Sequence, residues 1–392
     1  MCPNHIQYQN LYLKNIHLTH FKNYSDSKAE FHPKMNIITG LNGTGKTNLI
    51  EAVYVLCIGK SPFSNSDAAN MQTEADFYRI TGVFSDETTI ACAYSRRKKK
   101  VLQKNGKSYE RVSQHLGFCP VILIAPDDIQ IVKGGSLERR RLMDSVLCQI
   151  SREYMEQLTI YNRLRLQRNE VLKNFMERRT FDNDLLATYS EPMIVAGEFV
   201  YNFRKKWLDA LVEKFQEYHK LISNERESVS FSYRSVLNDK SFTEITTENL
   251  RKDSFAQRTT AGPHTDDWVF KIEDQPLKNR GSQGQQKSFL VALFLTLYAN
   301  LQEQTQKPPL LLLDDLFDKL DQKRLKALLK LVSMPNFGQV FITDTQSDAL
   351  MELLTEAQID YQHLEINEGC IDQKVREKVE KKERQFTHKT RY

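Results

Sequence analysis

The sequence predicts an α/β fold with mixed sheets and an inserted α-helical arm, and three observations support this prediction. A glycine-rich octet, Gly40 to Thr47, lies between an apolar strand pattern and a helix pattern. Residues 136–191 contain neither Gly nor Pro, which indicates long helices. The final third alternates helix and strand patterns, which is typical of a parallel sheet covered on both faces.

The octet matches G-x-x-x-x-G-K-[ST], the pattern of a phosphate-binding loop. Its glycines let backbone N–H groups turn toward phosphate oxygens at the positive end of the following helix. Lys46 adds a full charge, and the Thr47 hydroxyl suits a Mg²⁺ ion on the terminal phosphates of a nucleotide. The predicted nucleotide-binding residues are Gly40, Leu41, Asn42, Gly43, Thr44, Gly45, Lys46 and Thr47.

Composition indicates an ordinary soluble protein of two or three domains, with 392 residues, 40% hydrophobic and 27% charged. Residues 289–301 form the longest apolar-leaning stretch, which is too short to span a bilayer. Residues 1–10 lack the apolar region of a secretory signal, and the six cysteines form no C-x-x-C pair. We therefore expect a cytoplasmic protein with reduced thiols and no membrane partner.

The net charge of +5 is local, because residues 374–392 carry eight Lys and Arg against three Glu. The rest of the chain is formally neutral. Any nucleic-acid surface is therefore expected to be a patch, since no global positive field supports it.

The elements around the loop follow from alternating patterns. Residues 11–18 and 28–31 predict two strands before it, while 78–84 and 88–94 predict antiparallel strands after it. Asn105-Gly106 marks a hairpin, and Val121 to Ile124 predicts a buried strand. A basic run precedes the hairpin and is either a solvated loop or a nucleic-acid contact: Arg96, Arg97, Lys98, Lys99 and Lys100.

The arm is predicted from apolar residues that recur every three or four positions. One run extends from Leu147 to Leu164, and a second follows Pro192, from Phe199 to Tyr218, so we expect partner helices. The polar side of the first helix is either a solvated face or a set of phosphate contacts. The candidate phosphate contacts here are Arg163, Arg165, Arg168 and Lys173, with Arg139, Arg140 and Arg141 at its start.

Carboxylates for hydrolysis are expected at the end of a strand beside the loop. Leu310 to Leu313 predicts a buried strand, so Asp314 emerges at its carboxyl end, where it can hold Mg²⁺ through water. Asp315 is then placed to polarise the attacking water. After the strand pattern at 339–342, the stretch Thr343-Asp344-Thr345 contains no His, so we expect a hydroxyl of this stretch to contact the γ-phosphate.

A second anion-binding corner is predicted at Ser282-Gln283-Gly284-Gln285-Gln286, directly before a helix. One nucleotide seldom needs two such corners from a single fold. This corner, the strand with paired acids and then Lys319-Leu320-Asp321 resemble the signature motif, Walker B and D-loop of ABC-type ATPases. In that family the signature of one protomer closes over the nucleotide of the other.

With Gly262-Pro263-His264, Asp266-Asp267 and Leu166-Gln167-Arg168-Asn169 included, the chain resembles the bacterial RecF DNA replication and repair family from about residue 11 to about 365. Thr265 departs from the family pattern, as does Pro62-Phe63. The resemblance implies an ABC-type ATPase head that uses ATP and Mg²⁺. It also implies catalytic roles for Lys46, Asp314, Asp315, Ser282 and Asp321, with Ser282, Gly284 and Gln285 binding the nucleotide of a second copy.

The resemblance further implies an ATP-dependent homodimer on single-stranded DNA and single/double-strand junctions, which helps RecO and RecR load RecA. Asp315 stands where Glu is commoner, so slow hydrolysis is expected. The metal-sensing residue is either Asp127 or Gln130. Two alternatives use the same motifs, namely a transporter's nucleotide-binding subunit, which would have them closer together, and a structural phosphate-loop module without DNA.

The predicted domain organisation has five parts. Residues 1–10 are an extension, and 11–135 are the first part of the ATPase head. Residues 136–225 are the helical arm, and 226–370 are the second part of the head. The basic tail at 371–392 has few apolar residues, so we expect it to be disordered.

Overall fold

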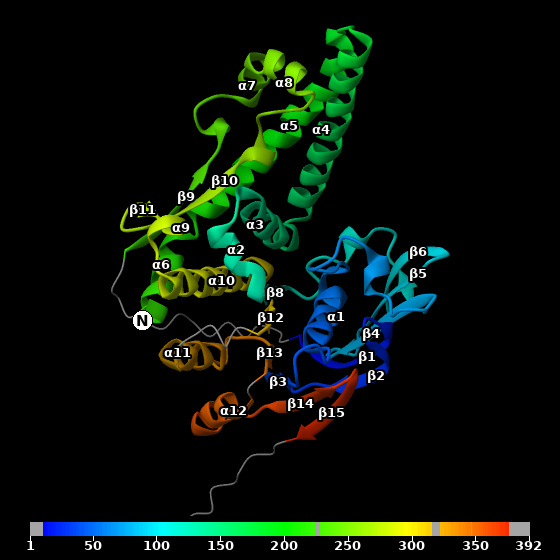
Figure 1. The fold of residues 1–392 in the computed structure, drawn as a ribbon, viewed down its shortest axis with the longest axis vertical. Coiled ribbons are helices and arrows are strands. Elements are labelled where there is room, and N and C mark those ends of the chain that lie inside the picture. Colours follow the sequence, from blue (N-terminus) through cyan, green and yellow to red (C-terminus); the bar gives the residue numbers. More distant parts are fainter. Residues whose placement is uncertain (1–10, 224–227, 316–321, 346, 376–392) are drawn as a thin grey trace, which may run out of the picture.

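The fold comes from a computed structural model, which describes residues 11–223, 228–315, 322–345 and 347–375. Figure 1 shows two parts: a head built on two large sheets, and an elongated helical arm that rises from it. The head contains the beginning and the end of the described chain, so the arm is an insertion, as the sequence predicts.

The central sheet of the head has the strand order β15-β14-β3-β13-β12-β8. All neighbours are parallel except the β14–β15 pair at one edge. The bounds are β3 (Met35–Thr39), β8 (Val121–Ile124), β12 (Leu310–Leu313), β13 (Val340–Asp344), β14 (Gln362–Asn367) and β15 (Cys370–Val375). The last of these corrects the sequence interpretation, because 371–375 form a strand and the expected tail cannot begin at 371.

Both faces of the central sheet are covered, which explains why its middle strands are continuously apolar. Leu311 and Leu313 belong to the core cluster formed with α10 (Gln283–Thr305), whereas Leu310 and Leu312 belong to the cluster formed with α1 (Lys46–Ile58). This alternation is the two-residue period of a strand. Helices α11 (Gln322–Val332) and α12 (Ser347–Glu356) lie on the α10 side.

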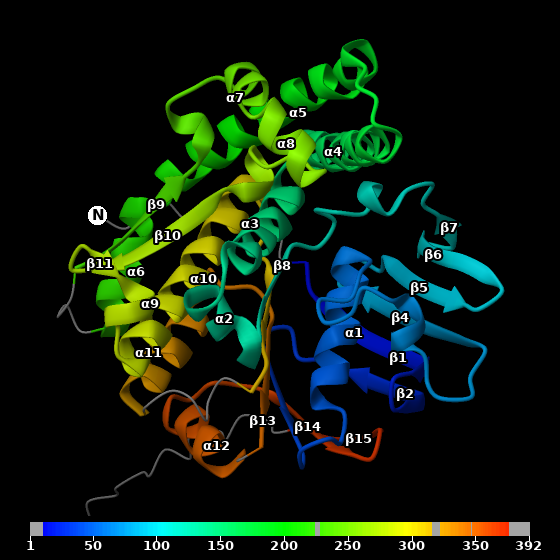
Figure 2. The ribbon, with the colours of Figure 1, turned by 45° about the horizontal axis from the view of Figure 1, so that its top comes forward.

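The second sheet is antiparallel, with the order β2-β1-β4-β5-β6-β7, and it packs on the other side of α1. Figure 2 shows this sheet beside α1. Its strands are β1 (Leu13–Phe21), β2 (Tyr24–Glu30), β4 (Phe77–Phe84), β5 (Thr89–Ser95), β6 (Lys98–Lys104) and β7 (Lys107–Ser108). The basic run therefore forms the β5–β6 turn and the first residues of β6.

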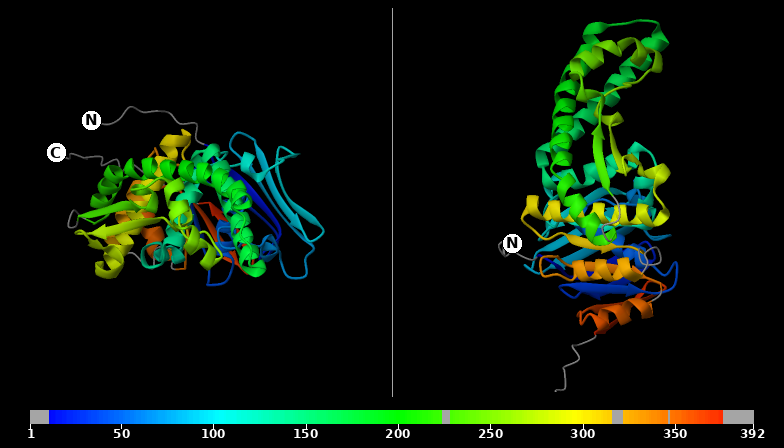
Figure 3. Two further views of the ribbon diagram at one scale, coloured as in Figure 1. Left: turned by 90° about the horizontal axis from the view of Figure 1, so that it is seen from above. Right: turned by 90° about the vertical axis from the view of Figure 1, so that its left-hand side faces the viewer.

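The arm is dominated by the antiparallel pair α4 (Arg152–Arg178) and α5 (Asn183–Asp209), as Figure 3 shows from the side. The expected break at Pro192 is wrong, because α5 continues through it. The break lies ten residues earlier, where Arg179 is left-handed (φ 53°) and the Asp182 carboxylate accepts a hydrogen bond from Leu185 N. Such a cap is worth about 1 kcal/mol, which favours starting the helix there.

Helices α2 (Ile129–Lys133), α3 (Ser136–Ile150) and α6 (Val212–Ser223) connect the arm to α10. A small sheet, β11-β10-β9, follows the arm, with β9 (Val229–Arg234), β10 (Asp267–Ile272) and β11 (Gln275–Pro276). It leads through α9 (Leu277–Arg280) into α10.

Between β9 and β10 the chain returns to the arm, which differs from the expected arm boundary at residue 225. Helices α7 (Phe242–Glu248) and α8 (Leu250–Ala256) lie near its tip. Phe242 and Ile245 of α7 share a core cluster with Tyr161 of α4 and Met193 of α5. The arm core is therefore built from two separate stretches of sequence.

Candidate nucleotide-binding site

The glycine-rich loop joins β3 to α1 and depends on glycine at two crowded positions. Gly40 has φ 147°, and a Cβ there would lie 2.4 Å from Ile366 O. Gly45 has φ 120°, and a Cβ there would lie 2.5 Å from Asn23 Nδ2. Residues with a Cβ seldom adopt these backbone angles, so the loop conformation requires the glycines that the motif supplies.

Lys46 lies over the loop, with its side chain largely buried. Its ammonium donates hydrogen bonds to Gly40 O at 2.7 Å and Leu41 O at 3.0 Å. Burial lowers the pKa of Lys46, while the carboxylates of Asp315 and Asp314 counteract that shift. The positive charge is therefore held at the loop by weak acceptors that phosphate oxygens could replace.

Asp314 and Thr47 meet as the sequence predicts. Thr47 Oγ1 donates to the Asp314 carboxylate, at 3.1 Å from Oδ1 and 3.0 Å from Oδ2. Burial raises the pKa of Asp314, and the hydrogen bonds from Thr343 and Thr47 oppose that shift. A nearby cation would stabilise the ionised form.

Of the two hydroxyls in the Thr343-Asp344-Thr345 stretch, that of Thr343 contacts the two acidic residues. Its hydroxyl donates to Asp314 Oδ1 at 2.7 Å and accepts from Asp315 N at 2.8 Å. It lies on the neighbouring strand β13 and is fully buried. The hydroxyl thus fixes the two acidic residues and does not offer itself to a phosphate.

Asp315 is held in an unusual conformation, with φ 45°. Within the described part of the chain, its buried Oδ1 has no hydrogen-bond partner. A buried carboxylate oxygen without a donor is costly, so this atom is well suited to a water molecule or another ligand. This agrees with the predicted water-positioning role and does not test it.

The oxygen atoms at Thr47 and Asp314 fit a Mg²⁺ ion, which typically takes one or two carboxylate or hydroxyl ligands and completes its shell with water and phosphate. No cluster of three or more His, Cys, Asp or Glu occurs among the described residues. A metal at this place would therefore depend on the nucleotide for further ligands.

A cavity of about 140 Å³ opens between the loop and the two acidic residues. Its lining combines only these two segments: Asn42, Gly43, Gly45, Lys46, Thr47, Asn48, Asp314 and Asp315. Neither Asp127 nor Gln130 lines it. Leu41 belongs to the loop and is 78% exposed, a large apolar side chain facing solvent.

The signature residues do not line this cavity. Ser282 caps α10, accepting from Gln285 N, while Gln285 Oε1 accepts from Ser282 N. Ser282 and Gln283 are exposed, whereas Gly284 and Gln285 are half-buried. Gly284 faces Arg324 of α11, since a Cβ there would lie 3.1 Å from its guanidinium. Asp321 lies outside the described residues.

The candidate DNA contacts separate into exposed and paired residues. Arg96, Arg97 and Lys98 are exposed at the β5–β6 turn, and Arg163 is exposed on α4. In contrast, Arg139 pairs with Asp267 at 2.7 Å and Arg140 donates to Asp266 O at 2.6 Å. These two arginines attach α3 to β10.

The interpretation of Arg168 as a surface residue is wrong. Its side chain is fully buried and pairs with Asp253 at 2.8 Å, while also donating to Ser190 and Thr259. The signal was present in the sequence, since Tyr154, Tyr161 and Arg168 are spaced seven apart and share the buried face of α4.

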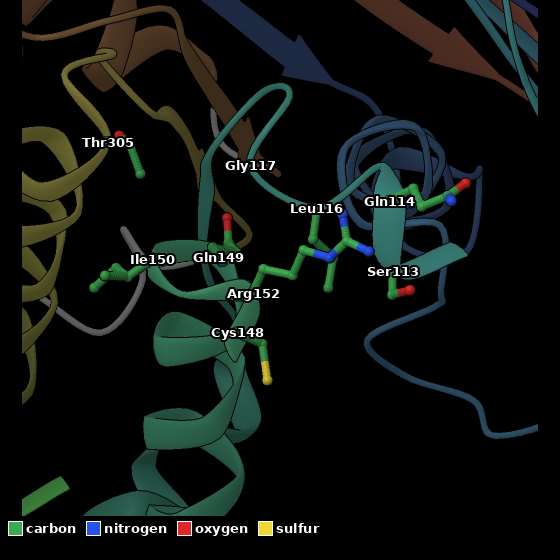
Figure 4. A pocket seen from close by; sticks show the side chains of 9 residues that line it. All are labelled: Ser113, Gln114, Leu116, Gly117, Cys148, Gln149, Ile150, Arg152 and Thr305. Carbon is green, nitrogen blue, oxygen red and sulfur yellow. The ribbon is translucent and has the colours of Figure 1, made fainter. Parts of the chain in front are cut away.

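A larger cavity, of about 280 Å³, lies at the base of the arm. Figure 4 shows Arg152 extending from the start of α4 toward Leu116 and Gln114, which precede β8. Gln149 also lines it, but its amide is already used by Val121 N and O. This cavity contains none of the motif residues.

In the described residues, no helix is both long and apolar enough to cross a membrane. Comparison with known families matches residues 12–367 to the RecF/RecN/SMC N terminal domain. A Flavobacterium johnsoniae protein named DNA replication and repair protein RecF is 39% identical over 341 residues, 86% of this chain and 95% of that protein. A protein of the same name from Phocaeicola vulgatus is 37% identical over 92% of this chain and 98% of its own length.

Solved structures agree with these relatives. A structure of the recombination mediator protein RecF with ATP, in the RecFOR pathway, superposes with a TM-score of 0.85 and 29% identity, covering 95% of this chain and all of that one. The Smc head domain of Pyrococcus furiosus, at 16% identity and a TM-score of 0.54, shares the fold alone. The same overall architecture thus occurs in an ATP-bound protein.

Proposed function

The chain belongs to the RecF family of DNA replication and repair proteins, with an ABC-type ATPase head, and from this we propose that it is an ATP-gated DNA clamp. ATP binds at the Gly40 to Thr47 loop, two copies close head to tail over the nucleotides, and slow hydrolysis releases them. The DNA substrate is a gap or a single/double-strand junction, where the clamp helps RecO and RecR load RecA.

One observation supports the clamp most directly, namely that the cavity combines the phosphate loop with Asp314 and Asp315 but excludes Ser282 and Gly284. The start of α10 is capped, and Ser282 and Gln283 are exposed there, so this corner presents hydroxyl and backbone groups to an approaching molecule. A second copy would place this corner over the first copy's phosphates. The site would then be complete only in the dimer.

The residues of the loop would share the chemistry as follows. Lys46 and the loop N–H groups would stabilise phosphate charge, while Thr47 and Asp314 would hold Mg²⁺, which neutralises charge on the terminal phosphates. Asp315 would orient the attacking water through its unpartnered oxygen. Its side chain is one methylene shorter than that of Glu, which supports weak hydrolysis. Stimulation of this hydrolysis by DNA is part of the proposal.

We assign DNA contact to the exposed arginines and lysine of the β5–β6 turn and to Arg163. In Figures 1 and 2, α4 is on the side of the arm nearer to β5 and β6, so the elements that carry the two sets lie on the same side of the molecule. Arg139, Arg140 and Arg168 are withdrawn from this proposal, because their side chains hold the fold together.

Family membership favours this function over a transporter subunit, and DNA binding separates it from an assembly module without DNA. The test uses light scattering with and without ATP, and binding to gapped DNA at several salt concentrations. The wild type should dimerise with ATP and bind gapped DNA more tightly in its presence. Salt-insensitive binding, or none, would contradict DNA clamping.

Two variants locate the dimer contact. Ser282→Arg should abolish ATP-induced dimerisation while leaving ATP binding by the monomer intact, and Thr243→Arg, which adds the same charge at an exposed position of α7, should change neither. Dimerisation of the Ser282 variant would exclude the composite site.

Lys46→Arg tests the phosphate loop. It should keep some ATP binding and lose turnover, and unchanged turnover would remove the loop assignment.

A further inference from the structure

Asn23 lies in the turn between β1 and β2, far from the phosphate loop in sequence but in contact with it. Its Nδ2 donates to Thr44 O at 2.6 Å, and its Oδ1 accepts from Asn48 Nδ2 at 2.8 Å. One amide thus connects the loop to the first turn of α1. The same amide occupies the space where a Gly45 side chain would lie.

Two further groups, the Tyr24 hydroxyl and the Gly369 N–H, bond the same stretch of backbone. Tyr24 OH donates to Gly45 O at 2.9 Å, and Gly369 N donates to Thr44 O at 3.2 Å. Both carbonyls of this stretch are therefore occupied on the side of β2 and the β14–β15 turn.

The consequence for the cavity follows from peptide geometry. In a trans peptide the C=O and the next N–H point in opposite directions. The carbonyls of Thr44 and Gly45 are held on the side away from the cavity, so the N–H groups of Gly45 and Lys46 point toward it. Both residues line the cavity. The two N–H groups offered to a phosphate are thus oriented by hydrogen bonds to the carbonyls of Thr44 and Gly45, which do not contact the phosphate themselves.

We propose that Asn23 is a positioning residue for nucleotide binding, acting through the Thr44–Gly45 peptide. The inference rests on the proposed ATP site. Tyr24 and Gly369 bond only the loop backbone, through a phenol hydroxyl and a backbone N–H. Asn23 bonds the loop backbone and also Asn48 in the first turn of α1.

The test replaces Asn23 by Asp, which keeps the shape and the acceptor for Asn48 but removes the donor to Thr44 O and adds repulsion. The dissociation constant for ATP should rise about tenfold or more, as expected for losing a hydrogen bond and gaining repulsion. The turnover rate at saturating ATP should stay within about threefold of wild type, since the carboxylates are unchanged. Gln72→Glu makes the same chemical change nearby, where the amide donates to Ser25, and should leave affinity unchanged.

A merely structural role predicts a different pattern, namely a lower melting temperature without nucleotide and unchanged ATP affinity, and that result would overturn the proposal. Asn23→Ala provides a second variant without added charge, and it should weaken ATP binding severalfold. If wild type itself does not bind ATP, the proposed function fails; if wild type binds and both variants bind equally well, only the role of Asn23 fails.

Discussion

Asp314 in the nucleotide site and Asp253 in the arm are both almost completely buried, yet their surroundings differ. Asp253 pairs with the buried Arg168 and also accepts from Thr260 N and Oγ1. Among the described residues, the hydrogen-bond donors to the Asp314 carboxylate are the hydroxyls of Thr47 and Thr343. The arm compensates its buried charge internally, whereas the site leaves charge available to a ligand.

A second buried charge, Arg204 at the base of the arm, is also compensated by groups of the protein itself. Arg204 of α5 donates to Asp144 at 2.7 Å, to Tyr154 at 2.9 Å and to Pro263 O at 2.8 Å. These contacts join α3, α4 and α5 to the turn before β10, which leads to the signature helix. Arg168 is neutralised by Asp253, although its buried Nη2 has no hydrogen-bond partner among the described residues. A buried charge therefore marks structure when an opposite charge of the fold pairs with it, and chemistry when it has no such partner.

The strongest test of the comparison is Asp253→Asn. It leaves Arg168 as a buried charge without its counter-ion, so the free energy of unfolding should fall by about 3–5 kcal/mol. Urea denaturation measures this, and ATP hydrolysis by the remaining folded protein should stay near wild type. A loss below 1 kcal/mol would show that the pair is dispensable.

The same substitution in the site, Asp314→Asn, should have the opposite result. The amide keeps an acceptor for the threonine hydroxyls but loses the charge that holds Mg²⁺, so hydrolysis should fall about 100-fold. Stability should be equal or higher, because burial already disfavours the ionised Asp314. Parallel hydrolysis and denaturation assays check this, and a large loss of stability would erase the distinction between the two regions.

The arm's histidine gives a pH test. Burial and the nearby charge of Arg165 lower the pKa of His264 to about 4, and the neutral ring accepts from Tyr161 OH and donates to Thr259 O. Because the unfolded ring has a pKa near 6.5, the unfolded chain binds more protons between pH 6.5 and 4. Stability is therefore lost as pH falls through this window, by about 2 kcal/mol at pH 5.

Comparing wild type with His264→Asn isolates this contribution. Other groups titrate in both proteins, including Asp128, whose burial raises its pKa to about 7 and acts in the opposite direction. The difference between the unfolding free energies of the two proteins should shrink by about 2 kcal/mol from pH 7 to pH 5. A constant difference would contradict the assignment.

The smallest effect is expected at the exposed turn. Arg97→Ala should leave the unfolding free energy unchanged within error, since the side chain lies in solvent. It should weaken binding to gapped DNA at low salt and reduce the salt slope by about one. Lys240→Ala, which removes a charge paired with Glu248, is the control and should leave the slope unchanged.

Sequence reasoning predicted the parts of the site that act through local spacing. The loop, Lys46, Thr47 and the acids after β12 follow from one motif and one apolar strand. It did not predict the contact of Thr343 with Asp314 or single out Asn23, because these contacts join residues 29 and 21 positions apart. Such contacts arise only when the strands assemble.

The arm shows a different limit. Its helices were predicted from apolar spacing, but the break was placed at Pro192 because proline ordinarily interrupts a helix. The cap at Asp182 decided the outcome instead. Arg168 was assigned to the surface by its charge, although its seven-residue spacing from Tyr161 places it on the buried face.

The contact between the β14–β15 turn and the phosphate loop also bears on how the protein is made. Gly369 N bonds Thr44 O, and Ile366 O packs against Gly40, so strands near the end of the chain complete a loop near its beginning. During synthesis the loop leaves the ribosome hundreds of residues before these partners exist. The nascent head must therefore wait for almost the entire chain, including the arm, before its nucleotide site can form.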